Sequence, residues 1–299
     1  MTIDSSGNLF VVYGESVVKV DPTGAVTTVA GYESIIADDN SDNWVPGPAT
    51  AYPVVDVGGI AVDKLGNLFL TSNDILAKVT PAGVLSRIAC DRHLCSFLQG
   101  IASDPLGNVY IGAGQRMIRM DQSGNVSVVA GSGNNGSPVP GPATSSPLNG
   151  VTDVVVAPDG SLYAIVPGVN NNGGWIVHVS NAGELSIVAG NGSSGKPIAG
   201  PALGSPFGYM NEIAMDASGN LYVTDGPASM ILKVSVSGEL SVVAGSGVSG
   251  SPVEGPATNS PLGWPGGIAI DGAGNIYFTD EGYPDVYRIT SDGTLHRLS

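Results

Sequence analysis

One pattern of four short strands recurs six times along the chain and restricts the folds open to it. Its last copy, residues 266–299, contains GGIAID, NIYFTD, VYRIT and TLHRLS, separated by stretches rich in Gly, Asp and Pro. Alternating apolar and polar residues over four to six positions predict β-strands. A sheet of four such strands has two bare faces, so each copy must pack against its neighbours.

A Gly-Asn turn after the first strand marks the copies, with Asp-Gly-Ser replacing it in the fourth, and successive turns are 41 to 59 residues apart. Repeats of four strands indicate a β-propeller. We therefore predict one all-β domain over 1–299, a six-bladed β-propeller of four-stranded antiparallel blades. The expected blades are approximately 1–57, 58–98, 99–150, 151–210, 211–265 and 266–299.

The ends of the repeat array lead to two expectations. The chain starts inside a repeat, so we expect that a preceding segment, including any signal segment, is absent from this sequence. Each blade is nearly complete within itself, so the ring should close by packing of blade 1 on blade 6 without an exchanged strand. We expect weaker contact at that junction.

Composition narrows the class of partner. The chain has 44 Gly, 21 Pro and only 12% charged residues, which is typical of a turn-rich all-β protein. Its net charge of −15 argues against nucleic acid, and no apolar run is long enough for membrane insertion. Cys90 and Cys95 could form a small disulfide or remain two thiols, and are too few for a zinc site.

The repeated motif resembles a known family. The order GIAVD, then GNL, then TD, then KVT, then VVAG is similar to the NHL-repeat β-propellers, and the resemblance covers essentially the whole chain. Long inserts contain GPAT at Gly47, Gly141 and Gly255 and GPAL at Gly200, as in bacterial members. The resemblance implies the fold and leaves the function open, because this fold hosts scaffolds, sensors, lyases and hydrolases.

The inserts follow second or fourth strands and should therefore gather on one face of the ring, called the top face here. Loops on a rigid scaffold often carry function. The inserts are residues 32–57, 91–99, 132–151, 191–210 and 246–265.

Comparison between copies separates scaffold residues from site residues. In five copies an Asp ends the first strand and a Lys or Arg lies in the third, whereas the fourth copy has Ala157 and His178. Their joint change predicts a structural pair or a shared turn-capping arrangement. His178 is then a scaffold variant, and the isolated His93 and His296 support no metal site.

Two acids break the pattern at the predicted mouth of the central channel. The residue opening the first strand is Gly59, Gly100 and Gly267 in three blades but Asp153 and Glu212 in blades 4 and 5. Paired carboxylates raise one pKa or bind a cation, for which calcium fits best. The alternatives are bonds to loop amides or water, or acid–base catalysis without metal. Candidate additional oxygen ligands are Thr152, Asn149 and Asn211.

Aromatic residues in the top-face segments form a second candidate site. Flat aromatic rings beside Asn, Asp and Gly suit a glycan or another small molecule, although they could instead hold the inserts onto the blades. The aromatic candidates are Trp175, expected in a loop, Trp44, Trp264 and Tyr209, accompanied by Phe207, Tyr52 and Tyr283. Polar candidates nearby are Asn149, Asn211, Asp225, Asp280 and Glu281.

A third and weaker candidate is the acidic run 38–43, DDNSDN, which resembles the start of a calcium loop. It lacks the Gly at the sixth position and the Glu at the twelfth. A solvated acidic loop is the ordinary alternative.

Three functions remain open. The first is a secreted or cell-envelope propeller whose top face and channel mouth bind a neutral small molecule or glycan. The second is a calcium-dependent hydrolase of the lactonase or esterase class, in which Asp153 and Glu212 hold the ion. Six-bladed gluconolactonases and paraoxonases have a catalytic calcium at this location, but their motifs are absent here. The third is a sensor domain that binds a protein partner through the same face.

Overall fold

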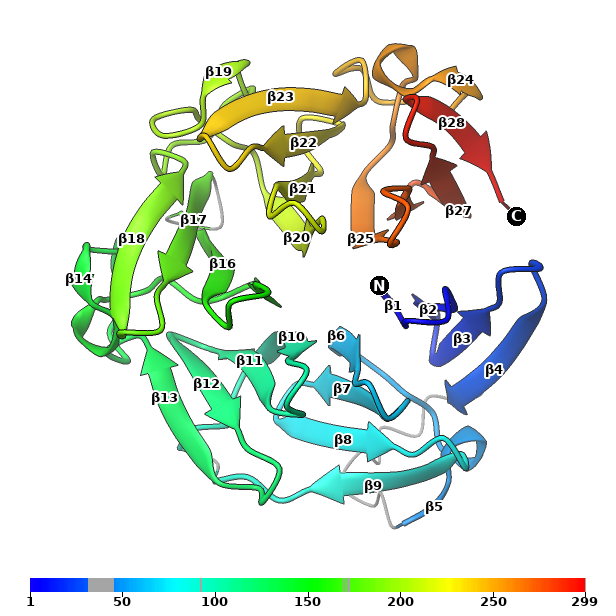
Figure 1. Cartoon of the computed structure of the whole chain (residues 1–299), viewed down its shortest axis with the longest axis vertical. Coiled ribbons are helices and arrows are strands. Elements are labelled where there is room, and N and C mark those ends of the chain that lie inside the picture. Colours follow the sequence, from blue (N-terminus) through cyan, green and yellow to red (C-terminus); the bar gives the residue numbers. More distant parts are fainter. Residues whose placement is uncertain (32–45, 92, 169, 171–172, 299) are drawn as a thin grey trace.

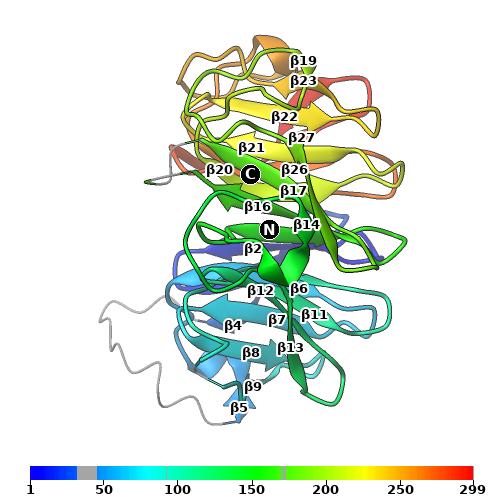
Figure 2. The ribbon, with the colours of Figure 1, turned by 90° about the vertical axis from the view of Figure 1, so that its left-hand side faces the viewer.

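The computed structural model describes residues 1–31, 46–91, 93–168, 170 and 173–298. Its strands form six antiparallel sheets around one axis, seen along that axis in Figure 1 and from the edge of the ring in Figure 2. The predicted all-β, six-bladed propeller is confirmed. In the described part of the chain, no helix has the length and apolar character needed to cross a membrane.

Two blades have sheets of four strands, which run outward from the axis in chain order. Blade 1 contains β1 (Thr2–Ile3), β2 (Leu9–Tyr13), β3 (Ser16–Val20) and β4 (Val26–Gly31). Blade 3 contains β10 (Leu98–Ser103), β11 (Val109–Ala113), β12 (Arg116–Met120) and β13 (Val126–Ala130).

The other four blades have a two-residue fifth strand at the outer edge. Blade 2 contains β5 (Gly47–Pro48), β6 (Val57–Val62), β7 (Leu68–Ser72), β8 (Ile75–Val79) and β9 (Val84–Ile88). Blade 4 contains β14 (Gly141–Pro142), β15 (Asp153–Val156), β16 (Leu162–Pro167), β17 (Gly174–Val179) and β18 (Glu184–Ala189). Blade 5 contains β19 (Gly200–Pro201), β20 (Met210–Met215), β21 (Leu221–Asp225), β22 (Met230–Val234) and β23 (Glu239–Ala244). Blade 6 contains β24 (Gly255–Pro256), β25 (Pro265–Ile270), β26 (Ile276–Asp280), β27 (Tyr283–Ile289) and β28 (Thr294–Arg297).

The acid that ends the first strand in five blades caps the following turn. In blade 2, Asp63 accepts the backbone N–H groups of Leu65 and Asn67, and the Asn67 side chain donates to its other oxygen at 2.7 Å. Gly66 has φ of +77°, a left-handed conformation that favours glycine. These bonds explain why Asp, Gly and Asn recur together.

Among the described residues the third-strand bases form no ion pair with these acids, but in blade 3 Arg119 donates to Asn108 of the Asp104-capped turn at 2.9 Å, as the shared turn-capping alternative expects. Lys78 lies over the ring of Phe69 at 5.6 Å, and Lys233 lies over Tyr222 at 5.3 Å. In blade 4 His178 packs on Tyr163, with ring centroids 4.7 Å apart. In these three blades the base packs on an aromatic neighbour of the second strand.

Each GPAT or GPAL motif begins what we call a clasp segment, which runs from its Gly to the apolar residue five positions after its Ala: 47–54, 141–148, 200–207 and 255–262. The Gly-Pro pair forms the fifth strand, at the outer edge of the following blade. In blade 4 the N–H of Ala143 donates to Gly183 at 2.8 Å, and its carbonyl accepts from Gly131 in blade 3 at 2.9 Å. A clasp segment therefore joins two neighbouring blades at the outer edge of the ring.

Two buried side chains anchor every clasp segment between blades. The Ala of the motif is at most 2% exposed, and the apolar residue five positions later is fully buried. These apolar anchors are Val54, Leu148, Phe207 and Leu262. The clasp part of each insert thus contributes to the core at the outer edge of the ring and does not extend over the channel mouth.

The junction between blades 6 and 1 has the smallest core in the described structure. Its buried members are Leu9, Val11 and Ala269, whereas the core at every other junction has at least eleven buried residues. No strand is exchanged across it, because β1 and β28 belong to different sheets. The expected weak closure of the ring is therefore confirmed.

The two cysteines form a disulfide between Cys90 and Cys95, which settles the alternative left open above. The disulfide closes a short loop before β10, in which Asp91 accepts backbone N–H groups from Leu94 and Cys95 at 2.8 Å. Cys95 is buried in the core between blades 2 and 3. Blade 3 has no clasp segment, so this loop fills the corresponding junction.

We expect reduction of Cys90–Cys95 to lower the free energy of unfolding by about 2 kcal/mol, because a closed loop restricts the unfolded chain. Urea unfolding with and without a phosphine reductant measures the change. A variant with both cysteines replaced by alanine should be insensitive to the reductant. Identical unfolding of the oxidised and reduced native protein would contradict this prediction.

Candidate ligand-binding site

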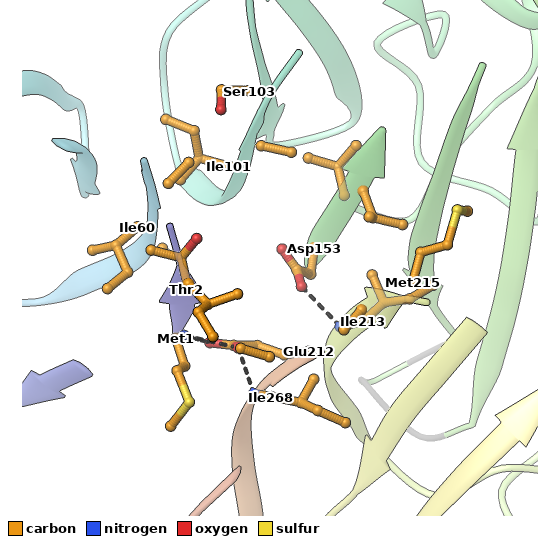
Figure 3. Close-up of a pocket in the computed structure, with 18 of the residues that line it drawn as sticks. Met1, Thr2, Ile60, Ile101, Ser103, Asp153, Glu212, Ile213, Met215 and Ile268 are labelled. Atoms are coloured by element: carbon orange, nitrogen blue, oxygen red, sulfur yellow. Dashed lines mark hydrogen bonds and ion pairs between the residues drawn. The ribbon is translucent and has the colours of Figure 1, made fainter. Parts of the chain in front are cut away.

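A cavity of about 240 Å³ lies on the axis of the ring and is lined by the innermost strand of every blade. Its walls are mostly small and aliphatic, as the alternating pattern of β6, β10, β15, β20 and β25 requires. Asp153 and Glu212 are the acids among the lining residues. The structure therefore brings the two predicted mouth residues to one cavity, as Figure 3 shows.

Glycine at the equivalent position of other blades is explained by close backbone contact. A Cβ added to Gly100 would lie 2.0 Å from Oδ1 of Asp153, and one added to Gly59 would lie 2.9 Å from the Cα of Gly100. The ring is tight from blade 2 to blade 4, so a side chain fits only where the spacing opens. This steric limit places the two acids on one side of the axis.

Both acids bond the backbone of the next blade. Oδ2 of Asp153 accepts the N–H of Ile213 at 2.9 Å, and Oε2 of Glu212 accepts the N–H of Ile268 at 2.9 Å. The amino group of Met1 donates to both Glu212 oxygens at 2.9 Å. The amides contacted belong to strands, whereas the sequence suggested loop amides or water. Each carboxyl thus links two inner strands as well as facing the cavity.

Burial and the neighbouring Glu212 carboxylate raise the pKa of Asp153 from its ordinary value to about 8. Asp153 is therefore largely protonated at neutral pH and can donate a hydrogen bond from the oxygen that does not accept from Ile213. Burial, Asp280 and Glu212 likewise raise the pKa of Glu281, an exposed residue after β26. Three interacting acids therefore surround the mouth.

The described acids supply only part of a calcium ligand set. Calcium takes six to eight oxygen ligands. Asp153 and Glu212 already accept strand N–H groups, and within the described residues no group of three or more His, Cys, Asp or Glu side chains could hold a metal. The acidic run 38–43 lies outside the described residues.

An aromatic rim adjoins the acids at the junction of blades 5 and 6. Trp264, just before β25, is 37% exposed, and a Cβ on Gly226 of blade 5 would lie 2.3 Å from its indole. Burial and the charge of Glu281 raise the pKa of Tyr209. Asn211 donates to the carbonyl of Pro265 at 2.8 Å and links the same two blades.

Two other predicted ligand residues, Asp225 and Asp280, are buried and position the rim. Asp225 accepts the N–H of Gly208 at 2.6 Å, next to Tyr209. Burial raises its pKa to about 6. Asp280 accepts the N–H groups of Gly263 at 2.7 Å and Trp264 at 2.9 Å. Each acid therefore fixes the loop that presents an aromatic residue.

The remaining candidates lie away from this rim or outside the described structure. Trp175 lies in β17 and not in a loop, and it is partly buried and packs against the core between blades 3 and 4. Asn149 donates to the carbonyl of Gly168 at 2.7 Å, and Phe207 is fully buried. Trp44 is outside the described residues.

Sequence reasoning missed the threonines that support the mouth. Thr224 accepts the N–H of Glu212 at 3.1 Å and donates to the carbonyl of Gly266 at 2.7 Å, and Thr279 accepts the N–H of Gly267 at 2.9 Å. Both come directly before the aspartate in the repeated Thr-Asp pair. Recurrence of that pair was the available signal.

No family model and no curated protein sequence matches the chain. Among solved structures it is similar to an auxiliary nutrient binding protein from Bacteroides thetaiotaomicron, with a TM-score of 0.69 and 13% identity over 98% of this chain and 66% of that one. It is also similar to a virginiamycin B lyase from Staphylococcus aureus, with a TM-score of 0.57 and 17% identity over 99% of this chain and 81% of that one. For a gluconolactonase from Xanthomonas campestris the TM-score is 0.58 and the identity 17%, over 81% of this chain and 74% of that one. At these identities the likenesses show the fold alone: the chain is a six-bladed β-propeller.

Proposed function

We propose that the protein is a ligand-binding propeller and that a neutral glycan or similar polyhydroxylated molecule binds at the channel mouth. The observation that carries this proposal is Trp264, which is 37% exposed and whose carbonyl accepts the N–H of Glu281 at 2.9 Å, directly before the strand that bonds Glu212. Sugar rings present an apolar face to an aromatic side chain and hydroxyl groups to carboxyl oxygens. A similar structure named as a nutrient binding protein is consistent with it.

The direct test is binding of the full chain to a glycan array, followed by calorimetry on any hit. We expect Trp264→Ala to weaken the affinity by about fivefold, because a stacked aromatic contact contributes about 1 kcal/mol. Tyr13→Ala is the matched control, because Tyr13 is 61% exposed at the end of β2 and is not part of the rim. The absence of any glycan bound by the native protein, or equal affinity of Trp264→Ala, would contradict the proposal.

A second candidate is a hydrolase of the lactonase or esterase class. The raised pKa of Asp153 beside Glu212 favours it, because a protonated and an ionised carboxyl together can supply a general acid and a general base. A substrate panel of lactones and esters, assayed with Asp153→Asn and Glu212→Gln, tests this function. Repeating the panel with added calcium and with a chelator tests the calcium-dependent form, which stays a prediction.

The lyase likeness gives weaker support for catalysis. One inactive form of that enzyme carries a histidine-to-alanine substitution. None of the three histidines of this chain is among the residues that line the central cavity. The remaining alternative is a protein partner that binds at the same aromatic rim. Binding of a peptide that depends on Trp264, with no binding of any glycan, would favour it.

We further assign the chain to the NHL type of propeller and to an extracytoplasmic location. Recurrent Asp-capped Gly-Asn turns and Thr-Asp pairs support the first assignment. The Cys90–Cys95 disulfide supports the second, because disulfides persist in oxidising compartments. Thiol labelling of the protein isolated from its native host would test the location.

A further inference from the structure

Phe97 occupies the position in blade 3 that Trp264 occupies in blade 6. Each lies directly before the innermost strand of its blade and three residues before the glycine at the channel mouth. The carbonyl of Phe97 accepts the N–H of Gly114 at 3.1 Å, and the carbonyl of Trp264 accepts that of Glu281 at 2.9 Å. Tyr209 has the same position and makes the equivalent bond in blade 5. The mouth end of the inner strands therefore carries three aromatic residues, of which sequence reasoning identified two.

Phe97 is exposed to solvent although its backbone conformation is unfavourable for a bulky residue. Its side chain is 72% exposed, whereas most phenylalanines are buried. Its φ of +52° lies in the left-handed region. The equivalent residues of blades 2 and 4 also have positive φ, but they are Asp56 and Gly150, which tolerate this conformation. Neither burial nor backbone preference therefore explains a phenylalanine at this position.

The backbone that presents Phe97 is fixed on both sides. Cys95, two residues before it, and Leu98, directly after it, are 2% and 1% exposed in the core between blades 2 and 3. The N–H of Phe97 donates to Oδ1 of Asp74 in blade 2 at 2.9 Å, and the N–H of Leu98 donates to the carbonyl of Asn73 at 2.7 Å. An exposed ring on a strained and fully bonded backbone is typical of a functional position.

Phe97 and Trp264 lie on opposite sides of the central axis. Blades 3 and 6 are three places apart in the ring of six, and their inner strands β10 and β25 line the central cavity from opposite sides (Figure 1). Asp153 and Glu212 line the same cavity from blades 4 and 5, which lie between them. Gly150 adds no side chain at the equivalent position of blade 4. A ligand that stacks on Trp264 can therefore reach Phe97 only by extending across the mouth.

We propose that the mouth binds an extended oligosaccharide, in which one sugar ring stacks on Trp264 and another stacks on Phe97. This inference rests on the proposed function and narrows its ligand to a chain of several sugar units. The hydroxyl groups of the units between the two stacked rings face Asp153 and Glu212. Phe97 is retained in a strained conformation because it supplies the second stacking contact, in the way that binding residues often reduce stability.

The test is calorimetry of the full chain with neutral β-1,4-linked gluco-, manno- and xylo-oligosaccharides of one to six units. We expect the affinity to rise with chain length, because a short ligand reaches only one of the two rings. Phe97→Asn should weaken binding of the longest ligand by about fivefold and leave the shortest unchanged, whereas Trp264→Ala should weaken both. Phe97→Tyr keeps an aromatic ring and should bind like the native protein.

Two controls separate lost binding from lost folding. Asparagine tolerates a left-handed backbone, so Phe97→Asn should have a melting temperature equal to or above that of the native protein. The matched control is Leu106→Asn, because Leu106 is 67% exposed in the turn that follows β10, at the opposite face of the same blade. This variant should bind every oligosaccharide like the native protein.

Two results would overturn the inference, and they differ in what they mean for the proposed function. If binding depends on Trp264 but Phe97→Asn equals the native protein at every chain length, the extended ligand is wrong and the proposed function stands. If none of these oligosaccharides binds the native protein, the inference also fails, and the glycan array then decides the proposed function separately.

Discussion

Replacement of Phe207 by alanine is expected to lower the free energy of unfolding by about 3–5 kcal/mol, the range for a large aromatic residue removed from a core. Phe207 is fully buried between blades 4 and 5, where it packs with Ile176 and Met210. It is the anchor of one clasp segment, so the cavity would open at an inter-blade junction. Urea unfolding followed by circular dichroism measures the loss.

Two variants make this prediction specific. Leu203→Ala, in the same insert but 63% exposed, should change the free energy of unfolding by less than about 0.5 kcal/mol. Phe207→Leu should cost less than Phe207→Ala, because leucine is the anchor at Leu148 and Leu262. A Phe207→Ala protein as stable as Leu203→Ala would mean that the clasp segments do not hold neighbouring blades together.

Asp153→Asn is expected to remove the part of the pH dependence of the free energy of unfolding that the Asp153 carboxyl causes. The folded protein keeps a proton on Asp153 up to its pKa of about 8, whereas the unfolded chain releases it near the model value of 3.8. Between these values the folded state binds more protons, so this group contributes stability at low pH that is lost as pH rises. The slope is about −1.4 kcal/mol per pH unit for one proton.

The measurement is the free energy of unfolding from pH 5 to pH 8.5 for both proteins. Asparagine can still accept the N–H of Ile213 but cannot ionise, so the variant should become the more stable protein as pH rises. Asp121→Asn is the control. Hydrogen bonds from Asn125 lower the pKa of this exposed turn residue, so its curve should run parallel to the native one in this range. Parallel curves for Asp153→Asn and the native protein would contradict the raised pKa.

The blade architecture could be predicted because its signals are local. Alternation in segments such as NIYFTD reports which residues face a neighbouring blade, and the turn Asp63–Asn67 uses residues that are close in sequence. Repeat register also placed Asp153 and Glu212 at one level of the axis, since equivalent positions of a closed ring meet there. These inferences need only the order of residues along one blade.

Other features could not be predicted because they join residues of different blades. The motif at Gly141 gave no sign that it would pair with Leu185 at the outer edge of the next sheet. Trp175 was expected in a loop because NNNGG precedes it, but pairing with Val166 extends β17 to include it. Asp225 and Asp280 were candidate ligand residues, whereas the structure buries both and bonds them to N–H groups of the inserts that precede them.

The sequence by itself determined six wedges of sheet, their strand pairing and the level at which two acids break a ring of glycines. Only the tertiary structure decided that Asp153 bonds the next blade and holds a proton. The physical reason is that hydrogen-bond partners, burial and pKa depend on distances between blades. A repeat pattern specifies each blade but not the side chains that its neighbours bring to the junction.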